Sequence, residues 1–271
     1  MKLRIVLLSA AFILSNALLA QGIKSLTKGQ KIVQLQNNTM NMKMEVMGQE
    51  MEQKMSMNTT GELSIAELKE DGVKIEMKQT KMKMHTSVMG QEIDLDTDNP
   101  DDEKSKQLAS SLNKIITVLT DKNSLITDMQ LDEQTKALMN SNLVAGMAVG
   151  QPLSFLLMLP EKLALNSAWK ISYGTDSTIK AVYNYTVTSI DNGLVNLAFT
   201  GSMNMSTTTQ TNGMSVVMKM NGPINGTATV NTKTFFVVKR TTTMDMKGNT
   251  EVAGQTIPFG MKATTEEKYN Y

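Results

Sequence analysis

Methionine recurs at every second residue through much of this chain, and this spacing constrains the fold more than any other feature of the sequence. Met40, Met42 and Met44 show the pattern most clearly. Successive side chains of a β-strand point to opposite faces, so a period of two gathers these thioethers on one face of a strand. The first third of the chain therefore predicts antiparallel strands that present rows of methionine on one side.

Short turn signals separate the predicted strands. The pentapeptide Val-Met-Gly-Gln-Glu occurs at residues 46–50 and 88–92, and residues 252–255 repeat it in part. Glycine readily adopts the positive φ of a chain reversal. Asp71-Gly72 and Asn192-Gly193 are further tight-turn signals, typical of β-hairpins. We expect a chain reversal at each of these places.

The parity of the apolar positions changes within two of the predicted strands. Val33 and Leu35 are odd, whereas the methionines from Met40 onward are even, with the change across residues 37–39. A second change separates residues 73–77 from Met82. A parity change inside a strand predicts a β-bulge or a break. Long strands with such flips favour a strongly curved antiparallel sheet or a half-barrel.

The middle of the chain carries different signals. An acidic run over residues 94–103 contains Asn99 and Pro100, which suit the cap and first turn of a helix. Residues 115–128 predict a small hairpin. We expect a second helix from residue 132 to about residue 147, and a short buried strand over residues 155–160.

The second half of the chain repeats the spacing of the first. A constant offset of 121 residues relates two sets of positions: Gly72, Met82 and Met84 in the first set, and Gly193, Met203 and Met205 in the second. Such self-similarity is typical of a diverged internal duplication. The sequence therefore predicts a mainly β fold, with minor α content, in two related halves with two helices between them.

The first residues have the pattern of a signal peptide. Lys2 and Arg4 precede an apolar run over residues 5–19, and Ala20 is a plausible cleavage point. No later stretch reaches the roughly 20 apolar residues of a transmembrane helix. We expect an exported, soluble protein of the periplasm or the extracellular space.

This pattern divides the chain into four expected segments. They are a signal peptide (1–20), an N-terminal antiparallel β half (21–98), a helical and hairpin connector (99–165), and a C-terminal antiparallel β half (166–271). Residues 21–271 are expected to form one compact unit.

Composition excludes several classes of protein. The chain has no cysteine, so disulfides and a lipid-modified N-terminal cysteine are excluded. Its 27 basic residues nearly balance its 26 acidic ones, which argues against nucleic acid as a partner. Aromatic residues make up 4% of the chain, so methionine and aliphatic residues must fill the core.

Three features of the sequence occur together. They are the Val-Met-Gly-Gln-Glu turns, the hairpin that runs over residues 63–84, and a Leu-Pro pair, Leu159-Pro160, followed by residues 165–169 that end in Trp169. In these features the chain resembles an uncharacterised domain-of-unknown-function family of exported bacterial β-rich proteins. The resemblance implies an exported β-rich protein and assigns no activity. The chain is also similar to curved-sheet lipoprotein carriers of the bacterial envelope, a likeness of fold alone.

The methionines provide the candidate site. Flexible, polarisable thioethers line adaptable apolar surfaces that accept varied ligands. We therefore expect a lipid or another hydrophobic small molecule on the curved sheet. Its predicted lining is Met40, Met42, Met44, Met55, Met57, Met82, Met84, Met203 and Met205. The alternative is a structural or interaction module of the cell envelope, with an envelope protein as partner and methionine as core filler.

A second alternative is a Cu(I) site formed by Met82, Met84 and His85, since thioethers are soft donors. A calcium loop over residues 94–105 lacks the required glycine and the final acid. His85 is the only histidine, and neither a nucleophile elbow nor a phosphate-binding loop is present. We expect neither enzymatic activity nor a cofactor.

Overall fold

The computed structural model describes residues 25–46, 48–99, 103–122, 124–130, 149–174, 179–211, 214–252 and 254–271. Its strands and its helix are β1 (Lys31–Val46), β2 (Gln49–Lys69), β3 (Gly72–Val88), β4 (Gln91–Asp96), α2 (Glu103–Ser111), β5 (Ile116–Asp121), β6 (Ile126–Gln130), β7 (Ala168–Tyr173), β8 (Ile179–Asp191), β9 (Leu194–Thr211), β10 (Met214–Asn231), β11 (Val237–Val252) and β12 (Gln255–Asn270).

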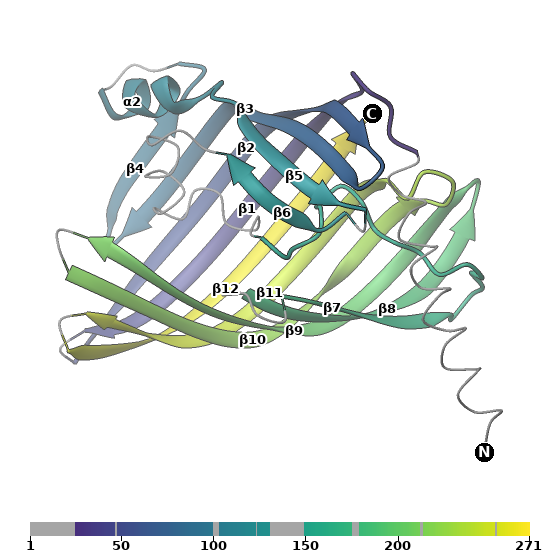
Figure 1. Cartoon of the computed structure of the whole chain (residues 1–271). Coiled ribbons are helices and arrows are strands. Elements are labelled where there is room, and N and C mark those ends of the chain that lie inside the picture. The colour runs from purple at the N-terminus through teal and green to yellow at the C-terminus, as the bar shows by residue number, and fades with distance from the viewer. Residues whose placement is uncertain are drawn as a thin grey trace.

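All twelve of these strands belong to one open antiparallel sheet (Figure 1). The strand order is β6-β5-β3-β2-β1-β12-β11-β10-β9-β8-β7, and β4 pairs with β3 beside this path. The N-terminal strands join the C-terminal strands along β1 and β12, whose register runs from Val33 opposite Asn270 to Met44 opposite Phe259. The expected mainly β fold is confirmed, as a single long sheet.

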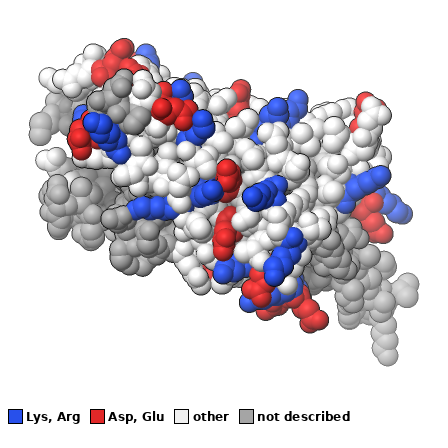
Figure 2. All heavy atoms as spheres, turned by 90° about the horizontal axis from the view of Figure 1, so that it is seen from above, with Lys and Arg blue, Asp and Glu red and all other residues white. Residues whose placement is uncertain are grey.

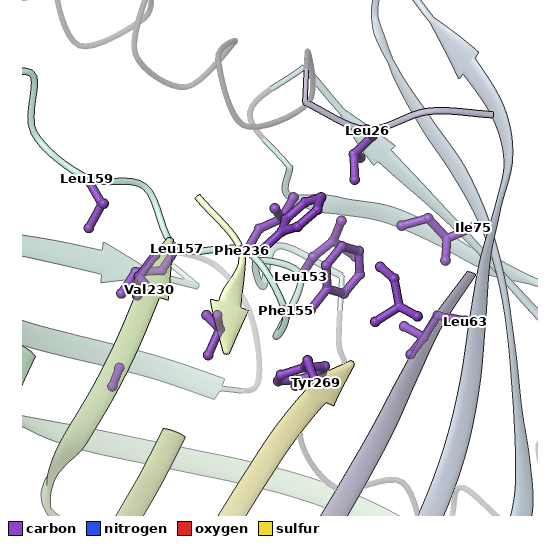
Figure 3. Packing of buried hydrophobic residues seen from close by; sticks show 14 of the residues in the cluster. Leu26, Leu63, Ile75, Leu153, Phe155, Leu157, Leu159, Val230, Phe236 and Tyr269 are labelled. Atoms are coloured by element: carbon purple, nitrogen blue, oxygen red, sulfur yellow. The ribbon is translucent and has the colours of Figure 1, made fainter. Parts of the chain in front are cut away.

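The two faces of the sheet differ in what they bury. We call the inner face the one that carries Ile32, Leu63, Val187, Leu197 and Tyr269, all of them buried. Directly paired residues of neighbouring strands point to the same face, so the strand registers assign every other position to the inner or the outer face. One buried cluster includes inner-face residues from β3 through to β8 (Figure 3). Strands so far apart in the sheet can share a cluster only if the inner face is concave.

The segment over residues 149–163 fills one end of this concavity. Leu153, Phe155 and Leu157 are buried against inner-face residues of several strands (Figure 3). The segment is fixed by two backbone hydrogen bonds to β11 and the residues before it, from Leu157 N to Phe235 O and from Val237 N to Phe155 O, each 3.0 Å. The burial expected for residues 155–160 is present, but their sheet pairing is a single bridge between Leu156 and Phe236.

One expected bulge is present and the other is absent. β3 shifts register against β2 between Thr60 and Gly61, so the parity change before Met82 is confirmed. β1 pairs with both neighbours without any shift, so the bulge expected over residues 37–39 was wrong. Val33 and Leu35 lie on the outer face; the inner positions of β1 are even throughout.

The predicted turns are present in the described residues. Met89 and Gly90 both have positive φ (51° and 80°), as do Asn192 and Gly193 (50° and 76°), which is the backbone of a type I′ hairpin turn. Asp71-Gly72 joins β2 to β3. The two glycines of the expected repeat act differently, since a Cβ at Gly72 would overlap the backbone of Thr120.

The connector is only partly helical. The hairpin expected over residues 115–128 is confirmed as β5 and β6. The helix expected after Pro100 is α2, which begins at Glu103. The second expected helix, over residues 132–147, lies outside the described residues, as does the expected signal peptide.

Among the residues that the structure describes, no helix has the length and apolar character needed to cross a membrane.

Glycines on the inner face let neighbouring strands approach closely. A Cβ at Gly226 would overlap the carbonyl oxygen of Thr241 and lie 2.6 Å from Cζ of Phe199. A Cβ at Gly201 would overlap the carbonyl oxygen of Val182. Glycines at such positions are the usual means by which a sheet is bent, and here they accompany the strong curvature seen in Figure 1.

Candidate functional site

Methionine forms a continuous lining on the inner face. All nine methionines predicted to line a ligand site lie there. Among the side chains that the structure describes, the strand registers add eight more that the prediction omitted: Met51, Met77, Met129, Met218, Met220, Met244, Met246 and Met261. The same period of two at residues 218–220 and 244–246 could have identified half of these from the sequence.

Cross-strand pairs connect the methionines of the two halves. Met205 lies opposite Met220, and Met246 lies opposite Met261. Met42 also lies opposite Met261, across the junction of β1 and β12. On the other side, Met40 lies opposite Met55 and Met57 lies opposite Met84. The lining therefore extends from β9 to β3 without changing face.

Most of the methionine side chains in this lining are partly exposed to solvent. Met82 and Met246 are buried, at 2% and 0% exposure. The other fifteen inner-face methionines whose side chains are described are half-buried. A fully packed core would bury them all, so this part of the concave inner face presents a partly exposed, flexible apolar lining, which we call the methionine-lined groove.

In the described strands, charged side chains lie almost entirely on the outer face of the sheet. In the described strands, Arg240 and Glu267 are the only charged residues whose register places them on the inner face. Every other lysine, aspartate, glutamate and the histidine of β1 to β12 lies on the outer face. There acids and bases pair across strands, as in Lys83–Asp96 at 2.8 Å and Lys78–Glu62 at 2.9 Å. A view from above shows both signs interspersed among uncharged side chains (Figure 2).

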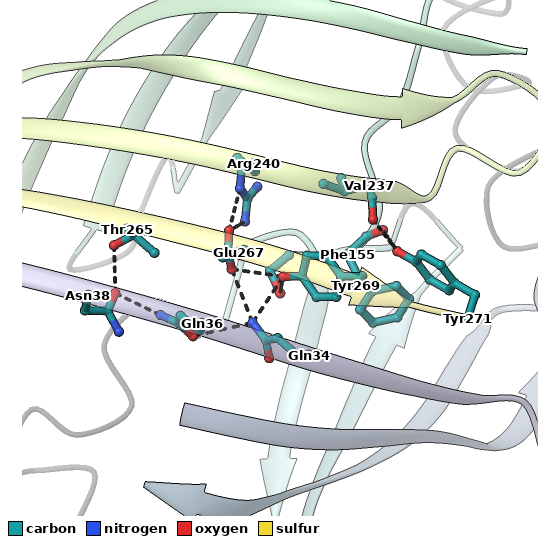
Figure 4. A network of polar contacts seen from close by, with 11 residues as sticks. Gln34, Gln36, Asn38, Phe155, Val237, Arg240, Thr265, Glu267, Tyr269 and Tyr271 are labelled. Carbon is teal, nitrogen blue, oxygen red and sulfur yellow. Dashed lines mark hydrogen bonds and ion pairs between the residues drawn. The ribbon is translucent and has the colours of Figure 1, made fainter. Parts of the chain in front are cut away.

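The single inner-face ion pair is held in a polar network (Figure 4). Arg240 Nε donates to Glu267 Oε2 at 2.6 Å. The other carboxylate oxygen accepts from the Tyr269 hydroxyl at 2.9 Å and from Gln34 Nε2 at 3.2 Å. The network continues along β1 from Gln34 through Gln36 to Asn38. It separates the apolar end filled by residues 149–163 from the methionine-lined groove.

Burial controls the ionisation of this network. Burial disfavours the charged guanidinium of Arg240, but the carboxylate of Glu267, together with Tyr269 and Tyr185, outweighs burial and holds the pKa of Arg240 above its ordinary value. Burial also raises the pKa of the Tyr269 hydroxyl, and the charge of Glu267 raises it further. A buried charge pair is stable only when its remaining hydrogen-bonding groups are satisfied. The pair therefore keeps its charges compensated within the network.

An aromatic group occupies the β7–β9 side of the inner face. Trp169 stacks on Tyr185 with ring centroids 5.4 Å apart, and Tyr185 lies 5.4 Å from Phe199. Tyr183 contacts both Tyr185 and Phe199. Tyr185 belongs to the buried cluster, and Trp169 and Tyr183 pack against it.

The three residues considered for copper lie on opposite faces. Met82 and Met84 point to the inner face, whereas His85 lies on the outer face opposite Ser56. His85 Nδ1 is 2.7 Å from Asp94 Oδ1. The structure does not bring these thioethers and the imidazole together. In the described residues, His, Asp and Glu side chains also form no group of three suited to a metal ion.

Residues 110–237 match a family of unknown function, DUF6263. This confirms the resemblance to a domain of unknown function. The DUF6263 region contains β5 to β10 and the buried segment 149–163, as well as the Leu159-Pro160 and Trp169 motif. The Val-Met-Gly-Gln-Glu turns lie outside it. Among curated proteins, no sequence gives a significant match.

Solved structures show a similar sheet. Lipovitellin matches 90% of this chain at 8% identity and a TM-score of 0.50, and this chain spans 25% of the lipovitellin chain. An outer membrane channel from Pseudomonas putida F1 matches at 7% identity and a TM-score of 0.26, with 90% of this chain and 97% of that chain covered. The translocator domain of the autotransporter NalP from Neisseria meningitidis matches at 9% identity and a TM-score of 0.23, covering 98% and 97%. Of these three, lipovitellin alone reaches a TM-score that supports a likeness, and the likeness is one of fold.

Proposed function

We propose that this is an exported, non-catalytic protein that binds an apolar or amphiphilic ligand along the methionine-lined groove of its inner face. The observation that carries the proposal is the combination of half-buried methionines with an inner face on which the described strands place no charge beyond one mutually bonded pair. Thioethers adapt to irregular apolar shapes. A partly exposed apolar lining of this extent marks a binding surface rather than ordinary protein surface.

The fold likeness supports the same class of ligand. Lipovitellin is described by its lipid–protein interactions, and it matches 90% of this chain in fold. Lipid binding by the present chain is part of our proposal. Export rests on the basic and apolar pattern of residues 1–20.

The alternative is a structural module of the cell envelope. It is supported by the end of the concave inner face that lies away from the methionines; we call the whole concave face the trough. There, residues 149–163 close the concavity with a packed core. The methionine-lined end has no such filling among the described residues, and most of its side chains remain half-buried. This difference between the two ends favours ligand binding over a purely structural role.

A fluorescent apolar dye tests the proposal. N-phenyl-1-naphthylamine is uncharged and emits more strongly in apolar surroundings, so it should bind the groove and brighten. The variant Met42→Gln/Met261→Gln puts two amides at the junction of β1 and β12. Because burying an unpaired amide costs about 1–3 kcal/mol, we expect roughly tenfold weaker dye binding.

The matched control is Met89→Gln, at a turn where the side chain is 67% exposed. It should leave dye binding unchanged, and the circular dichroism spectra of both variants should match the parent protein. Equal dye affinity for the parent and Met42→Gln/Met261→Gln would contradict binding in the groove. Failure of the parent protein to bind any dye would contradict the proposed function itself.

A further inference from the structure

A repeated turn lies along one end of the trough. The sequence Val-x-Gly-Gln closes the hairpins β1–β2, β3–β4 and β11–β12. In each, the glycine has φ near +80° (78° at Gly48, 80° at Gly90 and 80° at Gly254), which favours glycine over other residues. The strand order places these hairpins side by side. One turn design is therefore used three times in succession at the methionine-lined end.

Each repeat delivers one glutamine to the inner face. Gln49 is two residues from Met51, which lies opposite Met44. Gln91 lies opposite Val88, which in turn lies opposite Gln53 on the inner face. Gln255 is two residues from Ile257 and four from Phe259, which lies opposite Met44. Since side chains alternate between faces, these glutamines share the face of the methionines. We call Gln49, Gln91 and Gln255 the amide rim.

The amide rim is exposed, and the methionines begin directly behind it. All three glutamines are exposed, whereas Met42 and Met44, the next methionines of β1, are half-buried. The charged residues of the same hairpins lie on the opposite face, where Lys43 and Glu50 pair at 2.8 Å. At this end a ligand on the inner face therefore meets neutral hydrogen-bonding groups first and thioethers next.

A charged headgroup would find no complement in this lining. Arg240 and Glu267, the only charged residues that the described strands place on the inner face, neutralise each other within their network. Carboxamides both donate and accept hydrogen bonds without carrying charge. Moving an ion out of water without a partner costs far more than moving a neutral polar group.

We infer that the groove takes an uncharged amphiphile, such as a monoacylglycerol, whose hydroxyl or ester headgroup lies at the amide rim and whose chain lies along the methionines. The inference rests on the proposed function and specifies its ligand class and orientation. It follows from the placement of the three glutamines and the exclusion of unpaired charge from the same face.

Competition against the bound dye tests the ligand class. Three amphiphiles of one chain length are compared below their micelle concentrations: a monoacylglycerol, a fatty acid anion and an alkyl trimethylammonium cation. We expect the monoacylglycerol to displace the dye at about tenfold lower concentration than either ion, because neither ion has a compensating charge. Equal or stronger displacement by an ion would overturn the inference while leaving dye binding, and with it the proposed function, intact.

A charge introduced at the rim tests the orientation. Gln49→Lys/Gln255→Lys should strengthen displacement by the fatty acid anion about tenfold, because each headgroup then meets a lysine. The control Asn204→Lys/Thr208→Lys adds the same charge at exposed positions on the outer face of β9. If both pairs of substitutions change fatty acid displacement equally, the headgroup does not lie at the amide rim and the inference fails. A dye titration of each variant confirms that its groove is intact.

Discussion

At the scale of single residues, Gly226 shows how closely the strands of the trough approach each other. A side chain there would meet both the backbone of Thr241 and the ring of Phe199. Its place opposite Phe199 on β9 gives a glycine covered by a cross-strand aromatic ring, an arrangement that protects glycine in a sheet. The close approach of these strands, and with it the curvature of the sheet, therefore depends on a residue without a side chain at position 226.

Gly226→Ala should therefore destabilise the protein. Overpacking of this kind costs about 1–3 kcal/mol, which urea unfolding followed by circular dichroism would measure. Gly260→Ala is the matched control, because a Cβ at Gly260 meets nothing within 4 Å. A Gly226→Ala protein as stable as Gly260→Ala would show that the strands can separate at no cost.

His85 supplies a second residue-scale prediction, in pH dependence. The hydrogen bond that its Nδ1–H donates to Asp94 raises the pKa of His85 above the ordinary 6.5, and the negative charges of Asp94 and Glu92 act in the same direction. A raised pKa means that this contact stabilises the fold fully below pH 6.5 and that the stabilisation is lost as pH rises through the folded-state pKa.

Because the chain has one histidine, proton NMR of the imidazole isolates its titration. The midpoint should lie above 6.5 in the folded protein, and Asp94→Asn should lower it. The urea-unfolded chain provides the reference midpoint. Identical midpoints for the parent and Asp94→Asn would show that the contact with Asp94 does not form in solution.

At the scale of elements, the segment over residues 149–163 has little regular structure of its own but closes one end of the trough. Its backbone is held by the hydrogen bonds at Phe155 and Leu157, and the Tyr271 hydroxyl also donates to Phe155 O at 3.2 Å. This connection ties the middle of the DUF6263 region to the last residue of the chain. Packing of the segment therefore contributes to the stability of strands far from it in sequence.

Leu157→Ala should be strongly destabilising, by about 2–5 kcal/mol, because it removes a buried side chain from a packed cluster. Leu157 is 4% exposed, whereas Leu165, a few residues later, is 63% exposed. Leu165→Ala makes the same chemical change at the surface and should shift the free energy of unfolding by no more than about 0.5 kcal/mol. Equal effects in urea unfolding would contradict the packing of this segment.

Elements also show where sequence reasoning succeeds. The period of two, the Gly turns and the parity change in β3 follow from local backbone geometry, and all were predictable. The bulge expected in β1 was wrong because apolar Val33 and Leu35 were assigned to the buried face. The true inner positions there include Gln34, whose amide bonds to Glu267 and Tyr269 on β12. Such distant polar partners leave no periodic signal in the sequence.

At the scale of the whole molecule, the junction of β1 and β12 makes one surface from two stretches of sequence. The methionines on either side belong to strands far apart in the chain, yet Met42 and Met261 lie opposite each other. The composition of each strand predicted a methionine face. Two features depend on strand order, which the sequence does not reveal. One is the continuity of the methionine face, and the other is that, in the described strands, all ion pairs but one lie on the opposite face.

The strand lengths have a consequence for how such a sheet avoids pairing with other chains. β6 and β7, at the two ends of the strand order, have only five and six residues, whereas β2 has 21. Unpaired backbone groups on an edge strand invite aggregation, and short edge strands limit this hazard. The long strands that carry methionine are all interior, with both backbone edges largely hydrogen-bonded to their neighbours. The protein can therefore present an apolar surface to a ligand while offering little backbone to another copy of itself.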